Sequence, residues 1–485
     1  MRLPEEFIER MNVFFENSSV SGEGFLESFD KEPLKGLRMN RTKTPSSCFN
    51  DVLSAIGEAY NEVKWCDGGF YVENDSLGKD PYYHAGVFYP QEPSAMLPAQ
   101  VLSVKEGDNV LDLCAAPGGK ACRLGEDLYG TGLLVANEIN EERAKALLRN
   151  IERMGIANAV ILNETPEHLA ERFEGFFNKI LVDAPCSGEG MFRRDPFAVK
   201  SWEKFGPEVC IKLQADILKS AHMMLKPGGE LVYSTCTFCE GEDEQQIISF
   251  MNEHPEYKVI SHPEISGVTH LTSKDGLEGA MRIWPHVSSG DGHFCVHLNK
   301  EITEENKDFG RYDFTFAFRK RTDNYSFNKS KEALGNFMKE ILKDEPYKVF
   351  AKKIDSDFVI HKDKIHLLQV NEHLFDKLKV VKLGSFPGEI KETNKGRLFV
   401  PSHSLCLSLK FDDIREDSRV VLTRDDPRLQ RYLKGETVSL NDDEKDIVKK
   451  KGTIVVCVDK YPLGFGKTGG DFMIKNLYPK TWRLL

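Results

Sequence analysis

The stretch 110–120, Val-Leu-Asp-Leu-Cys-Ala-Ala-Pro-Gly-Gly-Lys, constrains the fold of this chain more than any other. It begins with a short apolar run typical of a buried parallel strand, and an amphipathic helical pattern follows over 120–128. A strand, a glycine turn and a helix in this order open a doubly wound α/β domain, whose ligands bind beyond the carboxyl ends of the strands. Glycine lets the backbone approach a ligand where a Cβ atom would clash. The stretch therefore predicts a functional edge on a parallel sheet.

The alternation of strand and helix continues along the chain, which predicts a parallel α/β fold. The expected strands are 109–113, 133–137, 159–163, 179–183 and 230–234, and the expected helices between them are 120–128, 141–154, 166–173 and 207–225. In a doubly wound sheet of order 3-2-1-4-5, the fourth and fifth strands are neighbours. Two further apolar runs follow at 280–286 and 293–298, and the second would suit an added antiparallel edge strand.

The length of 485 residues is too great for one core and predicts three or four domains. The expected parts are a small leading domain over 1–90, the α/β domain over 91–320, a linker and intermediate α+β domain over 321–400, and a β-rich module over 401–485. Within these parts we expect an alternating strand at 312–318, a linker at 323–331, and β-rich runs at 405–409, 419–422 and 453–458.

The composition indicates a protein without membrane segments. Apolar residues make up 40% of the chain and charged residues 29%, and no run approaches the roughly 20 apolar residues of a membrane helix. The first residues lack the apolar core of a signal peptide. The 11 cysteines are scattered from Cys48 to Cys457 and do not resemble a disulfide framework, which favours a reducing cytoplasm. The oligomeric state stays open.

The net charge of −11 argues only weakly against a nucleic-acid partner, because phosphate binding needs local positive charge rather than a basic total. Two stretches are locally basic, each with a single acid, Glu32 or Asp471. Their cations are Lys31, Lys35, Arg38, Arg41 and Lys43 in the first, and Lys460, Lys467, Lys475, Lys480 and Arg483 in the second. The segment 36–43 could lie along a nucleic-acid backbone. The charge balance therefore does not exclude RNA.

The glycine turn also predicts the kind of cofactor. Its spacing differs from the Gly-x-Gly-x-x-Gly of dinucleotide-binding turns, which disfavours a nicotinamide cofactor. Glu138 closes the next strand, where a carboxylate can accept hydrogen bonds from two ribose hydroxyls. This combination suits a nucleoside-type cofactor without a pyrophosphate, and S-adenosylmethionine is such a molecule. The alternative is an ordinary α/β turn that binds nothing.

Two cysteines are expected at the same edge of the sheet. Cys186 follows the fourth strand and Cys236 follows the fifth, so both thiols would face one pocket, with Asp183 between them and the cofactor. A thiolate is a strong nucleophile near neutral pH, which favours covalent chemistry. The alternatives are buried packing cysteines, a redox dithiol, and half a zinc site at Cys236-x-x-Cys239. Because no second pair of ligands lies nearby in the sequence, we expect no metal.

A thiolate and a carboxylate beside a methyl donor suit methylation of a pyrimidine at C5. C5 is unreactive toward a methyl sulfonium until a thiolate adds to C6 and makes the ring a nucleophilic enamine. An acid must hold cytosine N3 protonated or hydrogen-bonded, a role that suits Asp183, and a base must remove the C5 proton before the thiol is expelled. The cytosine has to be unpaired or flipped out to enter such a site.

These motifs resemble the NOL1/NOP2/Sun family of RNA 5-methylcytosine methyltransferases. The resemblance is carried by Asp-Leu-Cys-Ala-Ala-Pro-Gly-Gly-Lys at 112–120, Asp-Ala-Pro-Cys-Ser-Gly at 183–188 and Ser-Thr-Cys-Thr at 234–237. It covers about residues 1–300, and the stretches 462–467 and 475–479 resemble the PUA-like terminal module of the bacterial RsmF-like branch. The family resemblance implies a Rossmann-like class I methyltransferase domain with RNA-binding domains at both ends of the chain.

By that resemblance, Cys236 is the nucleophile, Cys186 helps to release the methylated base, and Lys120 touches the base or polarises the site. The implied cofactor-binding residues are Cys114, Ala115, Ala116, Pro117, Gly118, Gly119, Lys120, Glu138 and Asp183. One departure is that the third strand ends in Asn163 and Glu164, where the family often has an aspartate for the adenine amine. The implied substrate is ribosomal RNA of the small subunit, free or assembled. A tRNA methyltransferase and a catalytically idle assembly factor are the alternatives.

The last stretch of the chain mixes aromatic and basic side chains. Its rings belong to Tyr461, Phe465, Tyr478 and Trp482. Such rings could stack on bases while the lysines meet phosphates. The alternative is a small β core in which the rings are buried and the lysines are only solvated.

Overall fold

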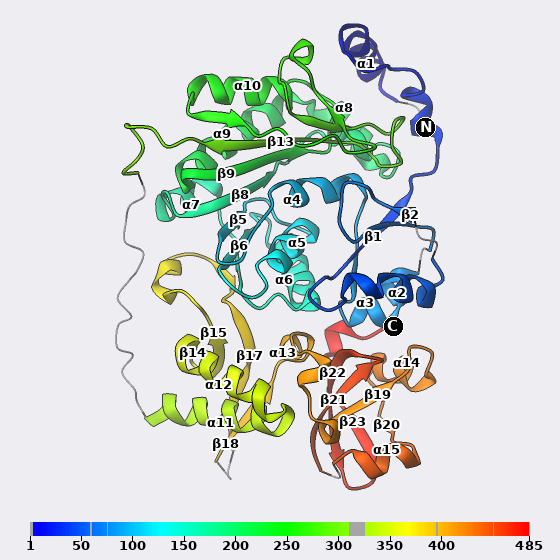
Figure 1. Ribbon diagram of the computed structural model, residues 1–485, viewed down its shortest axis with the longest axis vertical. Coiled ribbons are helices and arrows are strands. Elements are labelled where there is room, and N and C mark those ends of the chain that lie inside the picture. The colour runs from blue at the N-terminus through cyan, green and yellow to red at the C-terminus, as the bar shows by residue number, and fades with distance from the viewer. Residues whose placement is uncertain are drawn as a thin grey trace.

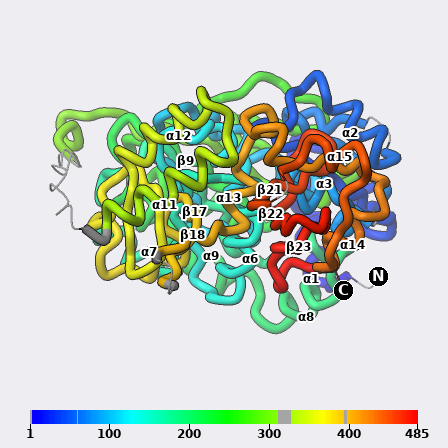
Figure 2. Tube along the Cα trace, turned by 90° about the horizontal axis from the view of Figure 1, so that it is seen from below, coloured from blue at the N-terminus to red at the C-terminus, as the bar shows by residue number. Residues whose placement is uncertain are grey.

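The computed structural model describes residues 3–58, 61–74, 76–309, 325–393, 396–449 and 451–484. Figure 1 shows a large central domain, the N-terminal part of the chain beside it, and two smaller C-terminal parts below. Figure 2, seen from below, shows that these two C-terminal parts lie side by side. No helix among the described residues is long and apolar enough to cross a membrane.

The central sheet has the strand order β11-β12-β13-β9-β8-β5-β6-β7-β16. Its parallel strands are β5 (Asn109–Asp112), β6 (Leu133–Asn137), β7 (Ala159–Leu162), β8 (Phe177–Asp183) and β9 (Leu225–Thr235). The predicted order 3-2-1-4-5 is therefore confirmed. Neighbouring residues of β5 belong to two different cores, since Val110 faces one and Leu111 the other. Burial on both faces explains why these strands read as continuous apolar runs.

Helices cover both faces of this sheet, with α5 and α6 packed on one face and α9 and α10 on the other (Figure 1). The predicted helices are α5 (Gly119–Asp127), α6 (Glu141–Met154), α7 (Pro166–Arg172) and α9 (Glu208–Met224). The further ones are α4 (Leu97–Val101), α8 (Pro196–Phe205) and α10 (Glu244–Glu253). In α6, the Asn140 side chain accepts two backbone N–H bonds at the N-terminus, and Gly155 ends the helix in the left-handed conformation.

The antiparallel strand expected at 293–298 is β13 (His293–Lys300), which pairs with β9. The expectation that this strand forms the edge of the sheet was wrong. The sheet continues through β12 (Met281–Ile283) and β11 (Thr269–His270), and β10 (Tyr257–Val259) also pairs with β13. A strand as short as β12 shows no alternation in the sequence, so the apolar run at 280–286 alone could not reveal it.

The leading sheet has the order β2-β3-β1-β4. Its elements are β1 (Lys35–Met39), β2 (Asn61–Glu62), β3 (Gly69–Val72) and β4 (Phe88–Pro90), with α2 (Phe49–Ile56) and α3 (Pro81–His84). The first helix, α1 (Glu5–Asn17), packs on the central domain instead. Phe7 and Phe14 of α1 share an aromatic cluster with Trp202 and Trp284. This helix therefore supports the central domain rather than the leading sheet.

The intermediate part begins with α11 (Tyr325–Ile341) and α12 (Asp344–Asp357). Its sheet, of order β14-β15-β17-β18, consists of β14 (Phe358–His361), β15 (Lys364–Leu367), β17 (Ser385–Thr393) and β18 (Gly396–Pro401). β16 (Val380–Lys382) leaves this unit and pairs antiparallel with β7 of the central sheet. A helix rather than a linker covers 325–331, and the strand expected at 312–318 lies outside the described residues.

The last part is a mixed sheet of order β19-β21-β22-β23-β20. It consists of β19 (Arg419–Leu422), β20 (Val438–Ser439), β21 (Lys451–Val458), β22 (Tyr461–Gly469) and β23 (Met473–Asn476), with α14 (Pro427–Leu433) and α15 (Asp442–Ile447). The strand expected at 405–409 was wrong, because this segment forms α13 (His403–Leu407). The Ser402 side chain caps the helix by accepting a bond from Leu405 N. A short apolar run does not by itself distinguish a buried helix from a strand.

Candidate active site

The three motifs meet where β5, β8 and β9 end. β8 and β9 are parallel neighbours, with Asp183 opposite Ser234 in register. The chain leaves these strands through Cys186 and Cys236, whose Sγ atoms lie 3.3 Å apart. Both side chains are half-buried. The fold thus brings together the two cysteines that the sequence places on separate loops.

A charged cluster lies beside the cysteines. The Lys120 ammonium is 2.7 Å from Asp183 Oδ2, and Ser234 Oγ donates a hydrogen bond to Asp183 Oδ1 at 2.9 Å. His293 Nε2 lies 3.6 Å from the same Oδ1 atom. Lys120 belongs to the first turn of α5, so the helix after the glycine turn brings a cation to the carboxylate at the end of β8.

The Lys120–Asp183 pair is ionised. Burial alone would raise the pKa of Asp183, but the Lys120 ammonium and His293 lower this pKa well below its usual range. Burial alone would lower the pKa of Lys120, but the Asp183 carboxylate raises it. Near neutral pH, Asp183 is therefore a hydrogen-bond acceptor that can hold the N–H group of a substrate.

Burial and the contact with Cys236 determine the protonation state of Cys186. The hydrogen bond with Cys236 and burial together raise the pKa of Cys186 well above the usual value of a thiol. Cys186 therefore keeps its proton near neutral pH, and its sulfur lies within hydrogen-bond distance of the Cys236 sulfur.

A buried carboxylate, Glu189, ties the two cysteine loops together. Glu189 follows Cys186 in the chain and accepts hydrogen bonds from Phe238 N at 3.0 Å and from Trp202 Nε1 at 2.9 Å. It also pairs with Arg10 of α1. Since Phe238 belongs to the Cys236 loop, Glu189 connects both loops with α8 and α1.

A second buried carboxylate, Glu242, holds the same loops from the other side. It accepts hydrogen bonds from Ser187 N and Gln214 Nε2, each at 2.9 Å. Gly190 N donates to the Cys236 carbonyl at 2.9 Å, and a Cβ atom on Gly190 would come within 2.9 Å of that oxygen. These contacts fix the backbone on either side of the two sulfur atoms.

Sequence reasoning missed Glu189, Glu242 and His293. A glutamate in a polar loop looks like an ordinary solvated side chain, and nothing in the local sequence marks these two as buried. His293 offered a signal, because it opens the alternating run that forms β13. The residue then lies on the strand next to β9, within reach of Asp183.

The glycine turn packs closely against the protein. Gly118 has a φ of +115°, and a Cβ atom there would meet Leu147 Cδ1 at 3.1 Å. A Cβ atom on Gly119 would meet Tyr89 Cε1 at 3.0 Å. The glycines therefore let α6 and β4 approach the turn, a role that the sequence prediction of a ligand-facing turn did not include.

Two acids around the turn fit a ribose-bearing ligand. Asp112 is fully buried, and neither of its carboxyl oxygens has a hydrogen-bond partner among the described residues. Burial and the Asp183 charge raise the pKa of Asp112 to about 8. Glu138 is 3% exposed; its Oε1 accepts from Asn140 N at 2.8 Å, and its Oε2 lies 3.3 Å from Arg143 NH1. Both acids retain hydrogen-bonding capacity for a cofactor.

The residues after the third strand bond to the protein itself. Asn163 Nδ2 donates to the Glu138 carbonyl at 2.8 Å. Glu164 accepts from Lys379 N at 2.6 Å, and its other oxygen lies 2.9 Å from His168 Nδ1. Asn163 and Glu164, which stand where the family often has an aspartate, thus anchor the intermediate part of the chain beside the central sheet.

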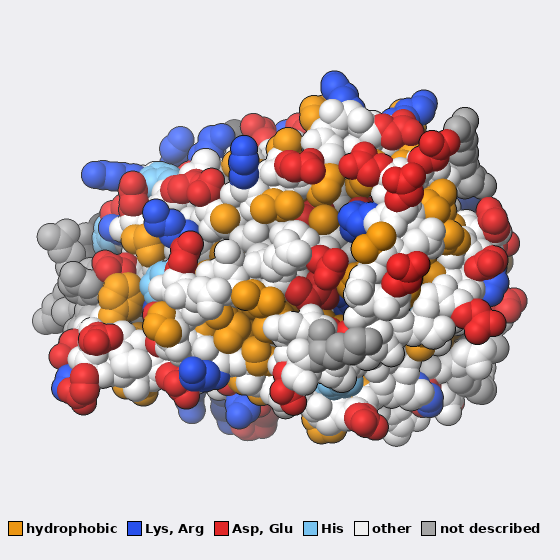
Figure 3. Space-filling model, turned by 90° about the horizontal axis from the view of Figure 1, so that it is seen from above, with side chains coloured by type: hydrophobic (Ala, Val, Ile, Leu, Met, Phe, Trp, Pro, Cys, Tyr) orange, Lys and Arg blue, Asp and Glu red, His pale blue; other side chains and the backbone are white. Residues whose placement is uncertain are grey.

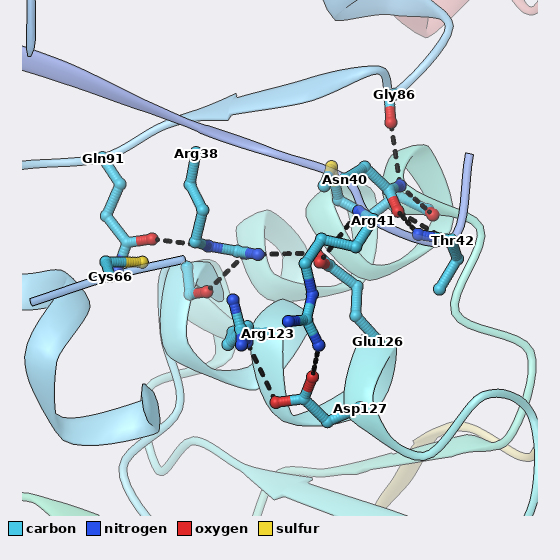
Figure 4. A network of polar contacts seen from close by, with 12 residues as sticks. Arg38, Asn40, Arg41, Thr42, Cys66, Gly86, Gln91, Arg123, Glu126 and Asp127 are labelled. Carbon is cyan, nitrogen blue, oxygen red and sulfur yellow. Dashed lines mark hydrogen bonds and ion pairs between the residues drawn. The ribbon is translucent and has the colours of Figure 1, made fainter. Parts of the chain in front are cut away.

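The basic segment 36–43 faces inward, so the expectation that it lies along a nucleic-acid backbone was wrong (Figure 4). Arg38 is fully buried; it pairs with Glu126 at 2.7 Å and donates to the Gly119 carbonyl at 3.2 Å. Arg41 forms ion pairs with Asp67 and Asp127. Because Glu126 and Asp127 lie on α5, the segment joins the leading sheet to the helix of the glycine turn.

Three of the four aromatic rings in the last stretch are buried, which contradicts their expected stacking on bases. Tyr461, Phe465 and Tyr478 are 2%, 3% and 1% exposed, and Trp482 is half-buried. The lysines of this stretch, Lys460, Lys467, Lys475 and Lys480, are exposed. The alternative expectation, a small β core with solvated lysines, describes this module better.

Comparisons with known families cover most of the chain. Residues 3–93 match the N-terminal domain of 16S rRNA methyltransferase RsmF, and residues 99–299 match 16S rRNA methyltransferase RsmB/F. Residues 419–484 match the methyltransferase RsmF PUA domain. The order of these matches follows the leading, central and last parts of the fold.

Relatives and solved structures agree with these matches. Ribosomal RNA small subunit methyltransferase F of Vibrio campbellii is 30% identical over 492 residues, 99% of this chain and 97% of the relative. The protein of that name from Vibrio vulnificus is 33% identical over 332 residues, 66% of this chain and 70% of the relative. A solved methyltransferase homolog protein from Pyrococcus horikoshii is 29% identical, with a TM-score of 0.52 over 61% of this chain and 95% of its own.

A second structure, NSun6 from Pyrococcus horikoshii with SFG, shares the fold at 21% identity, with a TM-score of 0.52 over 62% of this chain and 99% of its own. The resemblance carried by the three motifs is thus confirmed by comparisons that span nearly the whole sequence. The chain belongs to the ribosomal RNA small subunit methyltransferase F (RsmF) family.

Proposed function

We propose that this protein transfers a methyl group from S-adenosylmethionine to C5 of a cytosine in 16S ribosomal RNA, through a covalent bond between Cys236 and C6 of the base. The observation that carries the proposal is the 3.3 Å separation of the Cys186 and Cys236 Sγ atoms beside the ionised Lys120–Asp183 pair. A purely structural pair of cysteines would need no ion pair at its side. Family membership supports the same reaction class.

S-adenosylmethionine, when bound, supplies an electrophilic methyl group. The residues proposed to hold it are Cys114, Ala115, Ala116, Pro117, Gly118, Gly119, Lys120, Glu138 and Asp183, with Asp112 in addition. The unpartnered carboxyl oxygens of Asp112 and the carboxylate of Glu138 support this set, because a nucleoside-type ligand offers hydroxyl and amino groups that can donate to them.

The first step assigns attack to Cys236. Its thiolate forms the C6–S bond, the electron density of the C5–C6 double bond moves toward N3, and N3 takes up a proton from the adjacent Lys120 ammonium, which becomes a neutral amine. The Asp183 carboxylate, which Lys120 holds ionised before the reaction, then accepts the hydrogen bond of that N3–H group. The resulting enamine gives C5 the nucleophilic character that free cytosine lacks.

The last step assigns release to Cys186. Its proton passes across the 3.3 Å contact to the Cys236 sulfur as the C6–S bond breaks. The Cys186 thiolate so formed accepts the proton from C5, and the electron pair of that C–H bond restores the C5–C6 double bond. N3 returns its proton to Lys120, which restores the neutral aromatic ring. Loss of the Cys236 proton to solvent restores the thiolate, and this is the one proton that the methylation releases.

The proposal is tested by mapping 5-methylcytosine in cells with and without the gene. Bisulfite sequencing should lose a site in 16S rRNA on deletion, the wild-type gene and Cys210→Ser should restore it, and Cys236→Ser should not. Loss of a tRNA site instead would support the tRNA alternative, and an unchanged map would support an idle assembly factor. Purified protein tested on naked 16S rRNA and on small subunits decides the form of the substrate, which lies in the cytoplasm in either case.

A further inference from the structure

The outer face of α8 exposes two phenylalanine rings next to the cysteine loops. Phe197 is 73% exposed and Phe205 is 54% exposed. Clustered apolar side chains that stay in water mark an interaction surface, because their burial would be favourable. The helix does not need these rings for its own packing, since Val199 and Trp202 on the opposite face already bury it against the central domain.

The same face carries two cations, and the exposed acid of the helix, Glu203, lies at its flank. Helical spacing places five exposed residues on it: Phe197, Lys200, Ser201, Lys204 and Phe205. The Lys200 ammonium lies 5.5 Å from the Phe197 ring centroid, and the Lys204 ammonium lies 4.7 Å from that of Phe205. Within the described parts of the chain, no ion pair joins either ammonium to a carboxylate. Two rings beside two unpaired cations are complementary to a polyanion with flat bases.

This face is attached to the loop that carries Cys186. Trp202, on the inner side of α8, donates to Glu189 Oε1 at 2.9 Å and packs on Phe192 with ring centroids 6.2 Å apart. Gln214 of α9 donates to the Pro185 carbonyl at 3.0 Å. Exposed apolar side chains extend the surface onto α9 at Val209 and Leu213. A strand bound on α8 would therefore run past the loop of the reactive sulfur atoms.

We propose that the outer face of α8 binds the single-stranded RNA that flanks the target cytosine, with bases stacked on Phe197 and Phe205 and phosphates at Lys200 and Lys204. The assignment rests on the proposed function, because it takes RNA as the partner. Acidic and basic side chains are interspersed on the face seen from above (Figure 3), and the net charge is −11, so local cations must hold the strand. Because any base can stack on an aromatic ring, this surface should contribute affinity for RNA but no sequence specificity.

The double variant Phe197→Ser/Phe205→Ser tests the stacking contacts. Its affinity for a short single-stranded RNA, measured by fluorescence anisotropy, should fall roughly 5-fold to 100-fold per ring, and KM for RNA should rise accordingly. The Kd for S-adenosylmethionine and the midpoint of thermal unfolding should stay unchanged. Tyr129→Ser is the matched control, because Tyr129 is 56% exposed and precedes β6, at the opposite end of the sheet. Unchanged RNA affinity in the double variant would overturn the proposal.

The charge variant Lys200→Gln/Lys204→Gln tests the phosphate contacts. If the ring variant folds poorly, this second variant still shows whether α8 binds RNA. The slope of log affinity against log salt concentration should become shallower by about 1.4, as expected for two lost contacts on a single strand. An unchanged slope contradicts the assignment. If the wild-type protein methylates RNA and both variants bind it as the wild type does, only the role of α8 fails; if the wild-type protein methylates no RNA, the proposed function fails.

Discussion

At the scale of single residues, the site depends on a contact between two sulfur atoms and on the ion pair beside them. The pKa of Cys186 is raised by its hydrogen bond with Cys236 and by burial, so Cys186 keeps its proton near neutral pH. The family resemblance implies attack at Cys236 and release at Cys186, and the 3.3 Å contact between the two sulfur atoms permits the proton transfer that this division needs. Asp183 adds a fixed negative charge that Lys120 stabilises at 2.7 Å. Four groups thereby meet the needs of addition and elimination at a pyrimidine.

Asp112→Asn should remove a pH-dependent loss of stability. The pKa of Asp112 is raised from 3.8 to about 8 by burial and the nearby Asp183, so the folded protein binds a proton between these values that the unfolded chain has released. Wild-type stability should therefore fall, relative to Asp112→Asn, as pH rises through this window. The gap between the two proteins should widen by on the order of a few kcal/mol between about pH 5 and about pH 8. Urea unfolding of the cofactor-free proteins measures it; a gap that stays constant with pH would refute the assignment.

At the scale of elements, the sequence predicted the strands and helices whose pattern of burial can be read from neighbouring residues. β5 to β9 were predictable because burial on both faces gives continuous apolar runs. Their predicted order also placed Cys186 and Cys236 at the same edge of the sheet, where the structure has them. The inward turn of Arg38 was not predictable, because its partner Glu126 lies 88 positions along the chain. α8 was missed because its apolar residues point both inward and outward, which blurs the helical pattern.

Arg38→Met should weaken cofactor binding through the glycine turn. Arg38 donates to the Gly119 carbonyl at 3.2 Å, immediately before Lys120, so its loss should raise the Kd for S-adenosylmethionine about tenfold, the worth of one charge-assisted hydrogen bond. It should also destabilise the fold by about 3–5 kcal/mol, because Glu126 is left buried and unpaired. Calorimetric titration and urea unfolding measure the two effects.

Two variants separate positioning from stability in this test. Arg38→Met/Glu126→Leu removes both buried charges, so it should regain stability but not cofactor affinity, since the bond to Gly119 is still missing. Arg41→Met removes the ion pair to Asp127 at the far end of the same helix and should leave the cofactor Kd unchanged. Full recovery of affinity in the double variant would show that Arg38 acts through stability alone.

At the scale of the whole molecule, the leading and last sheets form one unit although the whole central domain separates them in sequence. Their buried side chains share a single core, drawn from Leu37, Phe49, Phe70 and Phe88 on one side and Val420, Tyr432, Val456 and Tyr461 on the other. Arg424 pairs with Asp80 at 2.7 Å across the same junction. Figure 1 accordingly shows the C-terminus beside α2 and α3. Composition could indicate these modules but not their contact, which depends on residues several hundred positions apart.

Tyr461→Ala should therefore affect folding rather than RNA binding. Tyr461 is 2% exposed and its ring meets the edge of Tyr82 with centroids 5.5 Å apart. Its removal should destabilise the protein by about 3–5 kcal/mol, as for other buried aromatic residues, while RNA affinity below the unfolding temperature stays unchanged. Lys475→Ala, at an exposed position, is the control and should leave stability unchanged. Lost RNA affinity at unchanged stability would return Tyr461 to the role of a stacking platform.

The most direct test of the central claim is denaturing gel electrophoresis of the Cys186→Ala protein after incubation with 16S rRNA and S-adenosylmethionine. The variant should accumulate a slow-migrating protein–RNA complex, because Cys236 attacks C6 and methylation proceeds while release is blocked. The same complex should be absent from Cys186→Ala/Cys236→Ser. A Cys186→Ala protein that forms no complex, or a double variant that still forms it, would contradict covalent catalysis by this pair of cysteines.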